Sequence, residues 1–247
     1  MRPIITAMTA MRLDKLLSAL GAASRSNCRD LIQAGRVKVN GAPAKKPADN
    51  VPPGAEVMLD GQALDIRLTR HVMLHKPAGV LTAREDARQQ TVMDLLPPVY
   101  ASLGCMPVGR LDKDTTGLLI LTTDGELAHR LLAPQRHVDK VYEARVEGTL
   151  AEEDREAFAA GIAFKDFTAL PAALDIIGPD LARVTVREGK YHQVKRMFAA
   201  RGKPVTALRR LRFGPIRLDE ALQPGQYREL TEEEAAALYA AAGMTYA

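Results

Sequence analysis

The sequence predicts an α+β protein, built from a small basic α/β module and a larger domain with a mixed, mostly antiparallel sheet. Three observations support this fold class. The chain has 247 residues, enough for one sizeable hydrophobic core and a small accessory domain. Residues 11–59 have the pattern of two short helices followed by short strands. Beyond them, helical and strand patterns are interspersed without the regular β-α-β repetition that a parallel sheet requires.

The first module, residues 11–59, begins with apolar residues at helical spacing. Ser24 suits the N-cap of a second helix. Two alternating segments, 37–39 and 57–59, then predict short strands, and the first of them runs into the hairpin signal Asn40-Gly41. The stripe that predicts the first helix consists of Leu13, Leu16, Leu17 and Leu20.

A polar connector, residues 60–70, is expected to lead to the larger domain, residues 71–232. In that domain the apolar patterns predict strands at 72–74, 118–121, 141–146, 182–186, 205–213 and 216–218, and helices at 91–96, 126–132, 152–158 and 193–200. Residues 1–10 are expected to form a disordered extension. Residues 233–247 are expected to be a helical or loose tail.

Composition argues against several classes of protein. No run of 18 apolar residues occurs, so no membrane span is expected. The two cysteines, Cys28 and Cys105, form no Cys-x-x-Cys pair, which fits a protein of the reducing cytoplasm. No histidines pair at a metal-binding helical spacing, and no glycine-rich phosphate loop is present. Neither a metal nor a cofactor is therefore expected.

Positive charge gathers in two blocks, although the formal net charge is only +4. Between Met11 and Met58 there are eight Lys or Arg residues (12, 15, 25, 29, 36, 38, 45, 46) against four acids (14, 30, 49, 56). Between Arg183 and Arg217 there are eleven against one, Glu188. Such blocks can simply solvate helix and strand faces, but two of them favour a polyanionic partner such as nucleic acid.

The segment from Gly109 to Leu121 carries the strongest sign of chemistry. It places Asp112 in a turn directly before an apolar strand, with Arg110 two residues upstream. Asp is a poor strand former and a good turn former. Packing does not require a carboxylate there, although a surface turn whose Asp caps its own backbone would tolerate one. The segment alone leaves a catalytic role and a turn role open.

Gly109-Arg110-Leu111-Asp112 resembles the catalytic loop of RNA pseudouridine synthases. Three further stretches match the RsuA-like branch of that family, in the family's order: His75–Val80, Lys140–Glu143 and Glu188–Phe198. In the first module, Arg12–Leu17 and Gly35–Gly41 resemble the S4 RNA-binding domain. The resemblance extends over residues 11–232.

The resemblance implies that uridine in RNA is isomerised to pseudouridine, a reaction that needs no metal and no redox cofactor. It assigns the catalytic carboxylate to Asp112. It also implies that Tyr142 packs against the target base and that Lys195 pairs with Asp112. Without the resemblance, Tyr142 would be an ordinary half-buried strand residue and Lys195 a solvated cation. Lys76-Pro77 is expected to shape a loop near the pocket, and His192 to be structural.

Seven basic residues are expected to contact RNA. Four of them lie on or after the second helix of the S4-like module, the part that faces structured RNA in the family that it resembles. The seven are Arg110, Lys190 and Arg196 in the larger domain, and Arg25, Arg29, Arg36 and Lys38 in the first module. Each of them could instead be a solvated surface cation. Tyr191–Phe198 and Asp114–Gly117 resemble the small-subunit branch more than the large-subunit branch, so the expected partner is 16S ribosomal RNA. A monomer is expected.

Three other readings remain open at this point. The chain could be a large-subunit (23S) ribosomal RNA pseudouridine synthase of the same family. It could be a noncatalytic RNA-binding assembly factor that keeps the fold, although Asp112 and Tyr142 are both present. A hydrolase with paired carboxylates, Asp112 and Asp114, is a third reading.

Overall fold

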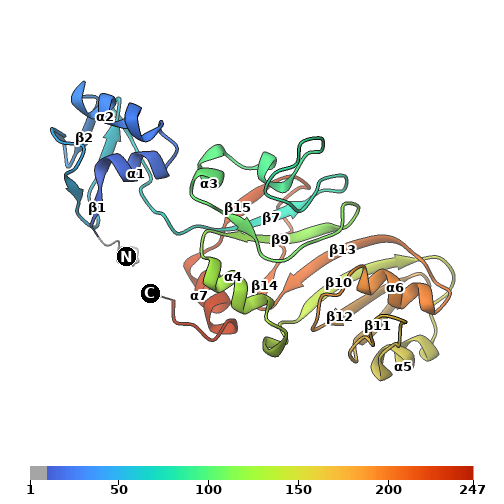
Figure 1. Cartoon of the computed structure of the whole chain (residues 1–247). Coiled ribbons are helices and arrows are strands. Elements are labelled where there is room, and N and C mark those ends of the chain that lie inside the picture. The colour runs from blue at the N-terminus through green and yellow to red at the C-terminus, as the bar shows by residue number, and fades with distance from the viewer. Residues whose placement is uncertain (1–9, 247) are drawn as a thin grey trace. The chain divides into compact units, whose positions relative to one another are not determined.

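The computed structural model describes residues 10–246, which form two compact units (Figure 1). The first unit comprises residues 10–70 and 97–105, and the second comprises residues 71–96 and 106–246. The expected disordered extension, residues 1–10, lies outside the described residues except for Ala10. Within residues 10–246, no helix is both long enough and apolar enough to cross a membrane.

The first unit packs two helices against small antiparallel sheets. The side chain of Ser24 accepts a hydrogen bond from the backbone nitrogen of Asn27, so it caps the second helix as predicted. Leu16, Leu17 and Cys28 are completely buried in the core between these elements. The elements are β1 (Met11–Arg12), α1 (Leu13–Ala19), α2 (Arg25–Gln33), β2 (Val37–Val39), β3 (Ala42–Pro43), β4 (Asn50–Val51), β5 (Val57–Leu59), β6 (Gln62–Ala63) and α3 (Pro98–Ser102).

The expected connector, residues 60–70, is in large part a structured piece of the first unit. Asp60 and Gly61 both have positive φ and turn the chain from β5 into β6, which pairs with it. Leu64, Ile66 and Leu68 then pack against the core of this unit. The prediction of a polar linker was therefore wrong for residues 62–68, because these alternating apolar side chains are covered by the unit they follow.

The second unit is built on a nine-stranded sheet in the order β11-β12-β10-β13-β9-β7-β15, with β14 paired to β13 and β8 paired to β9. Every pair is antiparallel except β9–β13, so the predicted α+β class with a mostly antiparallel sheet is confirmed. The strands are β7 (His71–Lys76), β8 (Met106–Pro107), β9 (Thr116–Thr122), β10 (Lys140–Val146), β11 (Ala173–Gly178), β12 (Leu181–Val186), β13 (Val205–Phe213), β14 (Ile216–Arg217) and β15 (Tyr227–Glu229).

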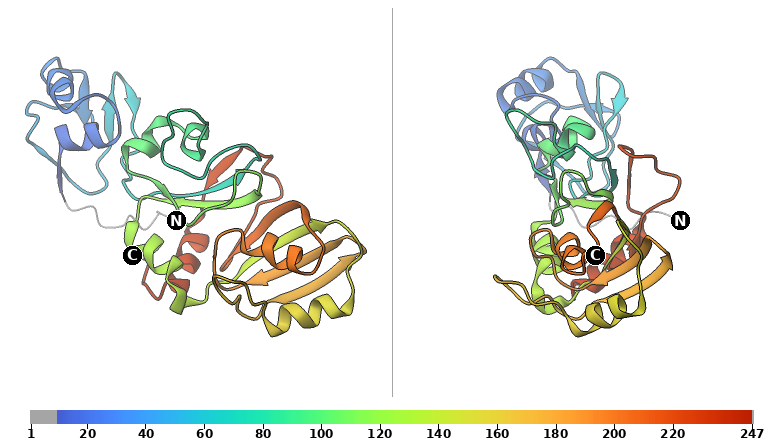
Figure 2. Two further views of the ribbon diagram at one scale, coloured as in Figure 1. Left: turned by 45° about the vertical axis from the view of Figure 1, so that its right-hand side comes forward. Right: turned by 90° about the vertical axis from the view of Figure 1, so that its right-hand side faces the viewer.

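Two pairs of helices cover this sheet (Figure 2). Helices α4 (Gly125–Leu132) and α7 (Glu232–Ala241) share one apolar core with β7, β9 and β13. Helix α5 (Glu152–Ala160) packs on β11, and its Phe158 ring contacts Phe198 of α6 (Gln193–Ala200), with ring centroids 4.8 Å apart. A short 3₁₀ turn, η2 (Pro134–Arg136), follows α4.

The C-terminal segment contains the expected helix, α7, but its described end is packed and not loose. Leu238 and Ala242 are completely buried, and Met244 and Tyr246 pack against the same core. The hydroxyl of Tyr239 donates a 2.5 Å hydrogen bond to Asp124, the N-cap residue of α4. Residues 233–246 therefore belong to the second unit, which the expected boundary at residue 232 cut short.

The helix expected at residues 91–96 is only the four-residue 3₁₀ turn η1 (Val92–Leu95). The Asp94 carboxylate accepts hydrogen bonds from the backbone nitrogen and the hydroxyl of Thr91, which closes the turn on itself. Leu96 is extended because it precedes Pro97. The edge strands β11 and β15 were not predicted, because short half-exposed strands carry a weak apolar pattern.

Candidate active site

Asp112 lies in the loop between β8 and β9 of the second unit. A buried lysine fixes the backbone of this loop. Lys76, at the end of β7, has no exposed surface, and its ammonium group donates hydrogen bonds to the carbonyl oxygens of Pro77, Lys113 and Thr115 at 2.9, 3.1 and 3.1 Å. Burial lowers the pKa of Lys76 to about 8. The expectation that Lys76-Pro77 shapes a loop near the site agrees with these contacts.

Gly117 lets β9 approach β13 directly after the Asp112 loop. The two strands pair in parallel at only two positions, Thr116 with Arg209 and Gly117 with Arg210. The φ of Gly117 is +102°, and a Cβ there would lie 2.3 Å from the backbone oxygen of Arg210. Because such a contact is impossible, any side chain at this position would displace the loop from β13.

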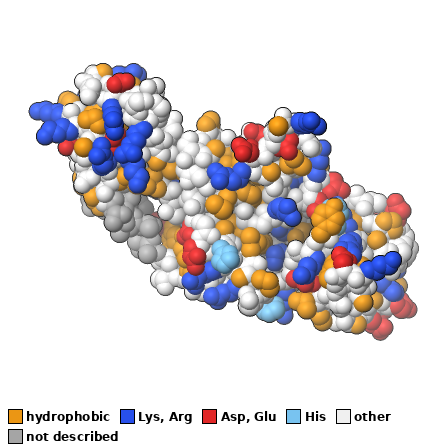
Figure 3. All heavy atoms as spheres, in the orientation of Figure 1, with side chains coloured by type: hydrophobic (Ala, Val, Ile, Leu, Met, Phe, Trp, Pro, Cys, Tyr) orange, Lys and Arg blue, Asp and Glu red, His pale blue; other side chains and the backbone are white. Residues whose placement is uncertain are grey.

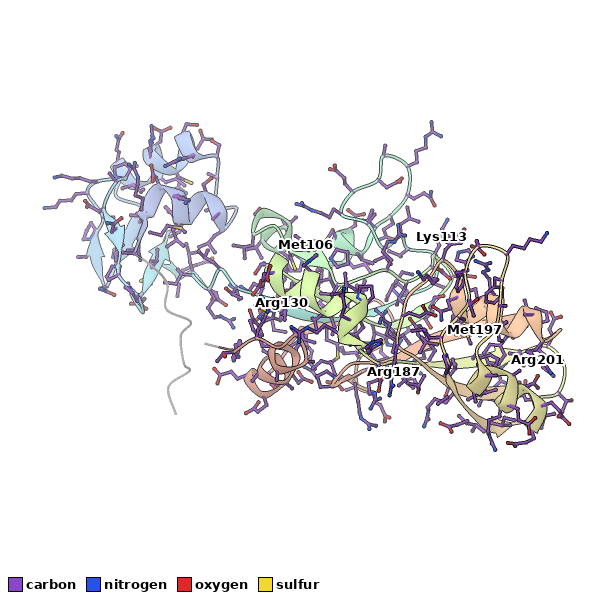
Figure 4. All side chains as sticks on the ribbon, turned by 60° about the horizontal axis from the view of Figure 1, so that its bottom comes forward. Met106, Lys113, Arg130, Arg187, Met197 and Arg201 are labelled. Carbon is purple, nitrogen blue, oxygen red and sulfur yellow. The ribbon has the colours of Figure 1, made fainter. Side chains whose placement is uncertain are left out.

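Lys195, on the first turn of α6, holds two carboxylates of the loop. Its Nζ lies 2.9 Å from Oδ2 of Asp112 and 2.5 Å from Oδ1 of Asp114. Burial opposes the charge of Lys195, but its hydrogen bonds to Asp114 and Asp112 outweigh burial and raise its pKa. The hydrogen bond from Lys195 also lowers the pKa of Asp114. In Figure 4, Lys113 and Met197 mark the loop and the helix that carry this group.

The two carboxylates differ in exposure. The Asp112 side chain is 28% exposed, whereas that of Asp114 is 75% exposed. Asp112 is thus the sheltered carboxylate, and the ammonium group of Lys195 fixes its position. This asymmetry favours Asp112 over a symmetric pair of carboxylates as the reactive group.

Tyr142 faces the same cavity as Asp112. This cavity has a volume of about 690 Å³, in the usual range for small-molecule sites. Tyr142 is buried in β10, between Val184 of β12 and Arg210 of β13 in the antiparallel register. The centre of the sheet therefore holds the ring rigidly while leaving it in contact with the cavity.

His192 and Tyr191 also line this cavity. Nε2 of His192 lies 3.6 Å from Oδ1 of Asp112, and the residue adopts a left-handed backbone conformation with φ of +50°. Its ring stacks on Tyr191, with centroids 3.8 Å apart, and Tyr191 is 72% exposed. His192 was expected to be structural, and the structure places it beside the carboxylate.

Of the three cations expected to contact RNA in this unit, two lie at the cavity and one does not. Arg110 and Lys190 are exposed and line the cavity. Arg196 points elsewhere. Its guanidinium group binds the Asp166 carboxylate at 2.5 and 3.0 Å and lies over the rings of Phe164 and Phe167. A phosphate contact by Arg196 would have to compete with these partners.

Three of the four basic residues expected to contact RNA in the first unit lie beside a carboxylate. Arg25 and Arg29 lie 3.6 and 3.4 Å from the buried carboxylate of Asp14. Arg36 pairs with Asp60, and Lys38 is exposed on β2. Figure 3 shows Lys and Arg side chains gathered over α1 and α2 on the visible face of this unit.

Comparison with known proteins shows the family of the chain. The family model for RNA pseudouridylate synthase matches residues 70–200, more than half of the chain. The chain belongs to the RNA pseudouridylate synthase family. The S4 domain model matches residues 11–57 of this synthase. As a pseudouridine synthase, the protein is an isomerase.

Relatives of this synthase match it over nearly its whole length. It is 46% identical to an uncharacterized RNA pseudouridine synthase of Bacillus subtilis (strain 168), over 91% of this chain and 96% of that protein. It is 42% identical to ribosomal small subunit pseudouridine synthase A of Escherichia coli (strain K12), over 92% of this chain and all of that protein. A solved structure described as a pseudouridylate synthase superposes with a TM-score of 0.66 and 35% identity, covering 93% of this chain and 100% of that one.

Two buried cations of the site escaped prediction from the sequence. Lys140 and Arg210 line the same cavity as Asp112 and Tyr142. Lys140 begins the stretch Lys140–Glu143 that resembles the family, so a signal was present in the sequence. Arg210 sits in a run of arginines on β13, and only the strand register shows which of them faces the cavity.

Proposed function

We propose that this synthase converts a specific uridine of 16S ribosomal RNA, in the small subunit, to pseudouridine, with Asp112 as the catalytic carboxylate. The observation that carries the proposal is the Lys195-bound carboxylate of Asp112 lining one cavity with the buried ring of Tyr142. The relatives named ribosomal small subunit pseudouridine synthase A support the choice of RNA.

In the proposed reaction the bond between N1 of uracil and C1′ of ribose breaks, and a bond between C5 and C1′ forms. A proton leaves C5 and N1 gains one, so atoms and electrons balance without an oxidant or a metal. Asp112 can serve as a nucleophile on the sugar or the base, or as a base toward a ribose proton. Each route needs an ionised carboxylate, and the ammonium group of Lys195 lies 2.9 Å from Oδ2 of Asp112.

The target uridine has to leave its helical stack to reach Asp112. Tyr142 offers a buried aromatic surface for the extruded base, and pairing on both sides of β10 keeps that surface in place. Arg110, exposed at the cavity and two residues from Asp112, is suited to contact the RNA backbone or the vacated position. Lys190 is suited to a phosphate contact on the same cavity.

The S4 unit supplies a second, basic contact surface. Arg25, Arg29, Arg36 and Lys38 are its proposed RNA contacts. Backbone contacts of this kind provide affinity and fix the position of the enzyme on the RNA but do not select the uridine. We place this activity in the cytoplasm, with a monomer as the acting form and ribosomal RNA or an assembly intermediate as the partner.

The decisive test is Asp112→Asn. The amide is nearly isosteric but cannot act as a nucleophile or a base, so pseudouridine formation should be abolished while RNA affinity stays close to that of the wild type. The matched control is Asp114→Asn, which removes the exposed carboxylate bound to the same lysine. Turnover by purified Asp112→Asn above a contamination control would refute the assignment.

Mapping of pseudouridines in ribosomal RNA, with and without the gene, tests the substrate. One 16S site should disappear in the deletion and return with the wild-type protein but not with Asp112→Asn. Loss of a 23S site instead would refute the small-subunit target while leaving the catalytic assignment intact.

A further inference from the structure

Two cations are buried in the wall of the active-site cavity. Lys140 on β10 is 9% exposed, and its Nζ donates a 3.0 Å hydrogen bond to the carbonyl oxygen of Val138. Arg210 on β13 is 2% exposed, and its Nε donates a 2.8 Å hydrogen bond to the carbonyl oxygen of Leu118. Arg210 is the cross-strand partner of Tyr142, so these cations adjoin the proposed base-binding ring.

Neither cation forms a direct ion pair within the described protein. The carboxylates of Asp139 and Glu188 act on Lys140 only at longer range, and both cations lie over the Phe213 ring. Across residues 10–246, neither cation has a carboxylate oxygen within 4.0 Å. Nη2 of Arg210 is buried and has no hydrogen-bond partner. Isolated buried charges are costly, and proteins normally pair them. Burial, and next the neighbouring charge of Arg210, lower the pKa of Lys140 to about 8.

We propose that Lys140 and Arg210 form an oxyanion site in the cavity, which binds a negatively charged oxygen of the nucleotide that reacts at Asp112. The inference rests on the proposed function and adds two residues to it. The guanidinium group of Arg210, whose Nη2 has no protein partner, supplies one cation at the cavity. The ammonium group of Lys140 supplies a second on the neighbouring strand. Hydrogen bonds from cations to anionic oxygens are shorter and stronger than neutral ones.

Two oxygens of the nucleotide fit this chemistry. One belongs to a phosphate of the extruded nucleotide, which is charged before the reaction. The other is a carbonyl oxygen of uracil, which becomes negative while the N1–C1′ electron pair resides on the detached base. That charge disappears when C5 bonds to C1′ and its proton leaves. A phosphate contact acts on binding, whereas a contact to the detached base acts on the rate.

A purely structural role makes a different prediction. If the two cations only tie backbone carbonyls together, removal of Lys140 should lower stability and leave ligand affinity and rate unaffected. If they form an unfilled oxyanion site, removal of one charge relieves repulsion in the free protein. Lys140→Met should then unfold at the same temperature as the wild type or higher.

The test uses the full-length protein and its Lys140→Met variant, with Arg217→Met as the matched control because Arg217 is an exposed cation of the same unit. The affinities for UMP and uridine are measured by titration, and single-turnover pseudouridine formation is measured at saturating RNA. For a phosphate contact, the preference of the wild type for UMP over uridine should fall about tenfold or more in Lys140→Met. For a contact to the detached base, the two affinities should keep their ratio and the rate should fall about 10- to 100-fold.

Restoration of most of the lost preference or rate by Lys140→Arg would support the oxyanion site. A folded Lys140→Met variant that matches Arg217→Met in both the UMP preference and the rate would overturn it. If Lys140→Met does not fold, Arg210→Lys gives the same readings, since it keeps a charge and removes Nη2. A wild type that makes no pseudouridine would refute the proposed function, and the comparison of UMP with uridine would still decide whether the site binds an anion.

Discussion

Replacement of Lys195 by Met should slow pseudouridine formation by roughly 30- to 150-fold. Met keeps most of the side-chain length but removes the charge that lies 2.9 Å from Asp112 and 2.5 Å from Asp114. Loss of one partner costs about 0.2–1 kcal/mol for exposed ion pairs and about 3–5 kcal/mol for buried ones. The Lys195 and Asp112 side chains are 21% and 28% exposed, nearer the buried case. We therefore expect about 2–3 kcal/mol, which gives the stated change in rate.

The assay is single-turnover product formation at saturating RNA, which separates chemistry from binding. Arg196→Met is the matched control, because it removes a neighbouring cation of the same helix that binds Asp166 instead of the loop. Its rate at saturating RNA should stay within about fivefold of the wild type, since loss of a partly exposed pair costs at most about 1 kcal/mol. Lys195→Arg should retain more activity than Lys195→Met.

Two results would refute this reasoning. If Arg196→Met is the slower enzyme at saturating RNA, Lys195 is not the cation on which chemistry depends. If lower salt restores the activity of Lys195→Met, the lost interaction was a screened contact with RNA phosphate and not the pairing with Asp112.

Three further predictions follow from the geometry. Lys76→Met leaves three backbone carbonyls without their donor. Urea unfolding should therefore show a free energy of unfolding lower by about 1–3 kcal/mol, and the single-turnover rate should fall. If both stay unchanged, Lys76 does not hold the loop. The hydrogen bond from Arg12 holds the pKa of the buried Asp14 at about 2; because that pKa is depressed, the stability it provides is present above about pH 4 and is lost as pH falls through about 2. Asp14→Asn should therefore lower stability at pH 7 and flatten acid unfolding of the first unit between pH 4 and 2, and an unchanged acid profile would contradict the assignment. Lys38→Gln should lower the log–log salt slope of RNA binding by about 0.7–0.9, one phosphate contact, while an unaltered slope would remove Lys38 from the RNA surface.

Local patterns in the sequence were sufficient for most elements and for the position of Asp112. The leucine stripe of α1, the Ser24 cap of α2 and the apolar runs of β9 and β10 depend on neighbours in the chain, and the structure has these elements where they were expected. The turn before β9 contains an Asp that packing does not require, and this local feature marked Asp112 as a candidate. The S4 match over residues 11–57 and the synthase match over 70–200 agree with the stretches that suggested them.

Tertiary structure alone decided which side chains meet. Lys195 and Asp114 are 81 positions apart, and only the packing of α6 beside the β8–β9 loop brings the ammonium group to both carboxylates. The adjacent residue, Arg196, was predicted to contact an RNA phosphate. Its position on the helix directs its side chain to Asp166 and two phenylalanine rings instead. The apolar side chains at 64–68 were assigned to a linker, because a chain alone does not show which surface will cover them. The importance of Lys140 and Arg210 becomes visible only from the strand register, which places both beside the cavity. Their burial is a property of the folded sheet and not of their neighbours in sequence. The energetic cost of an unpaired charge follows from that burial.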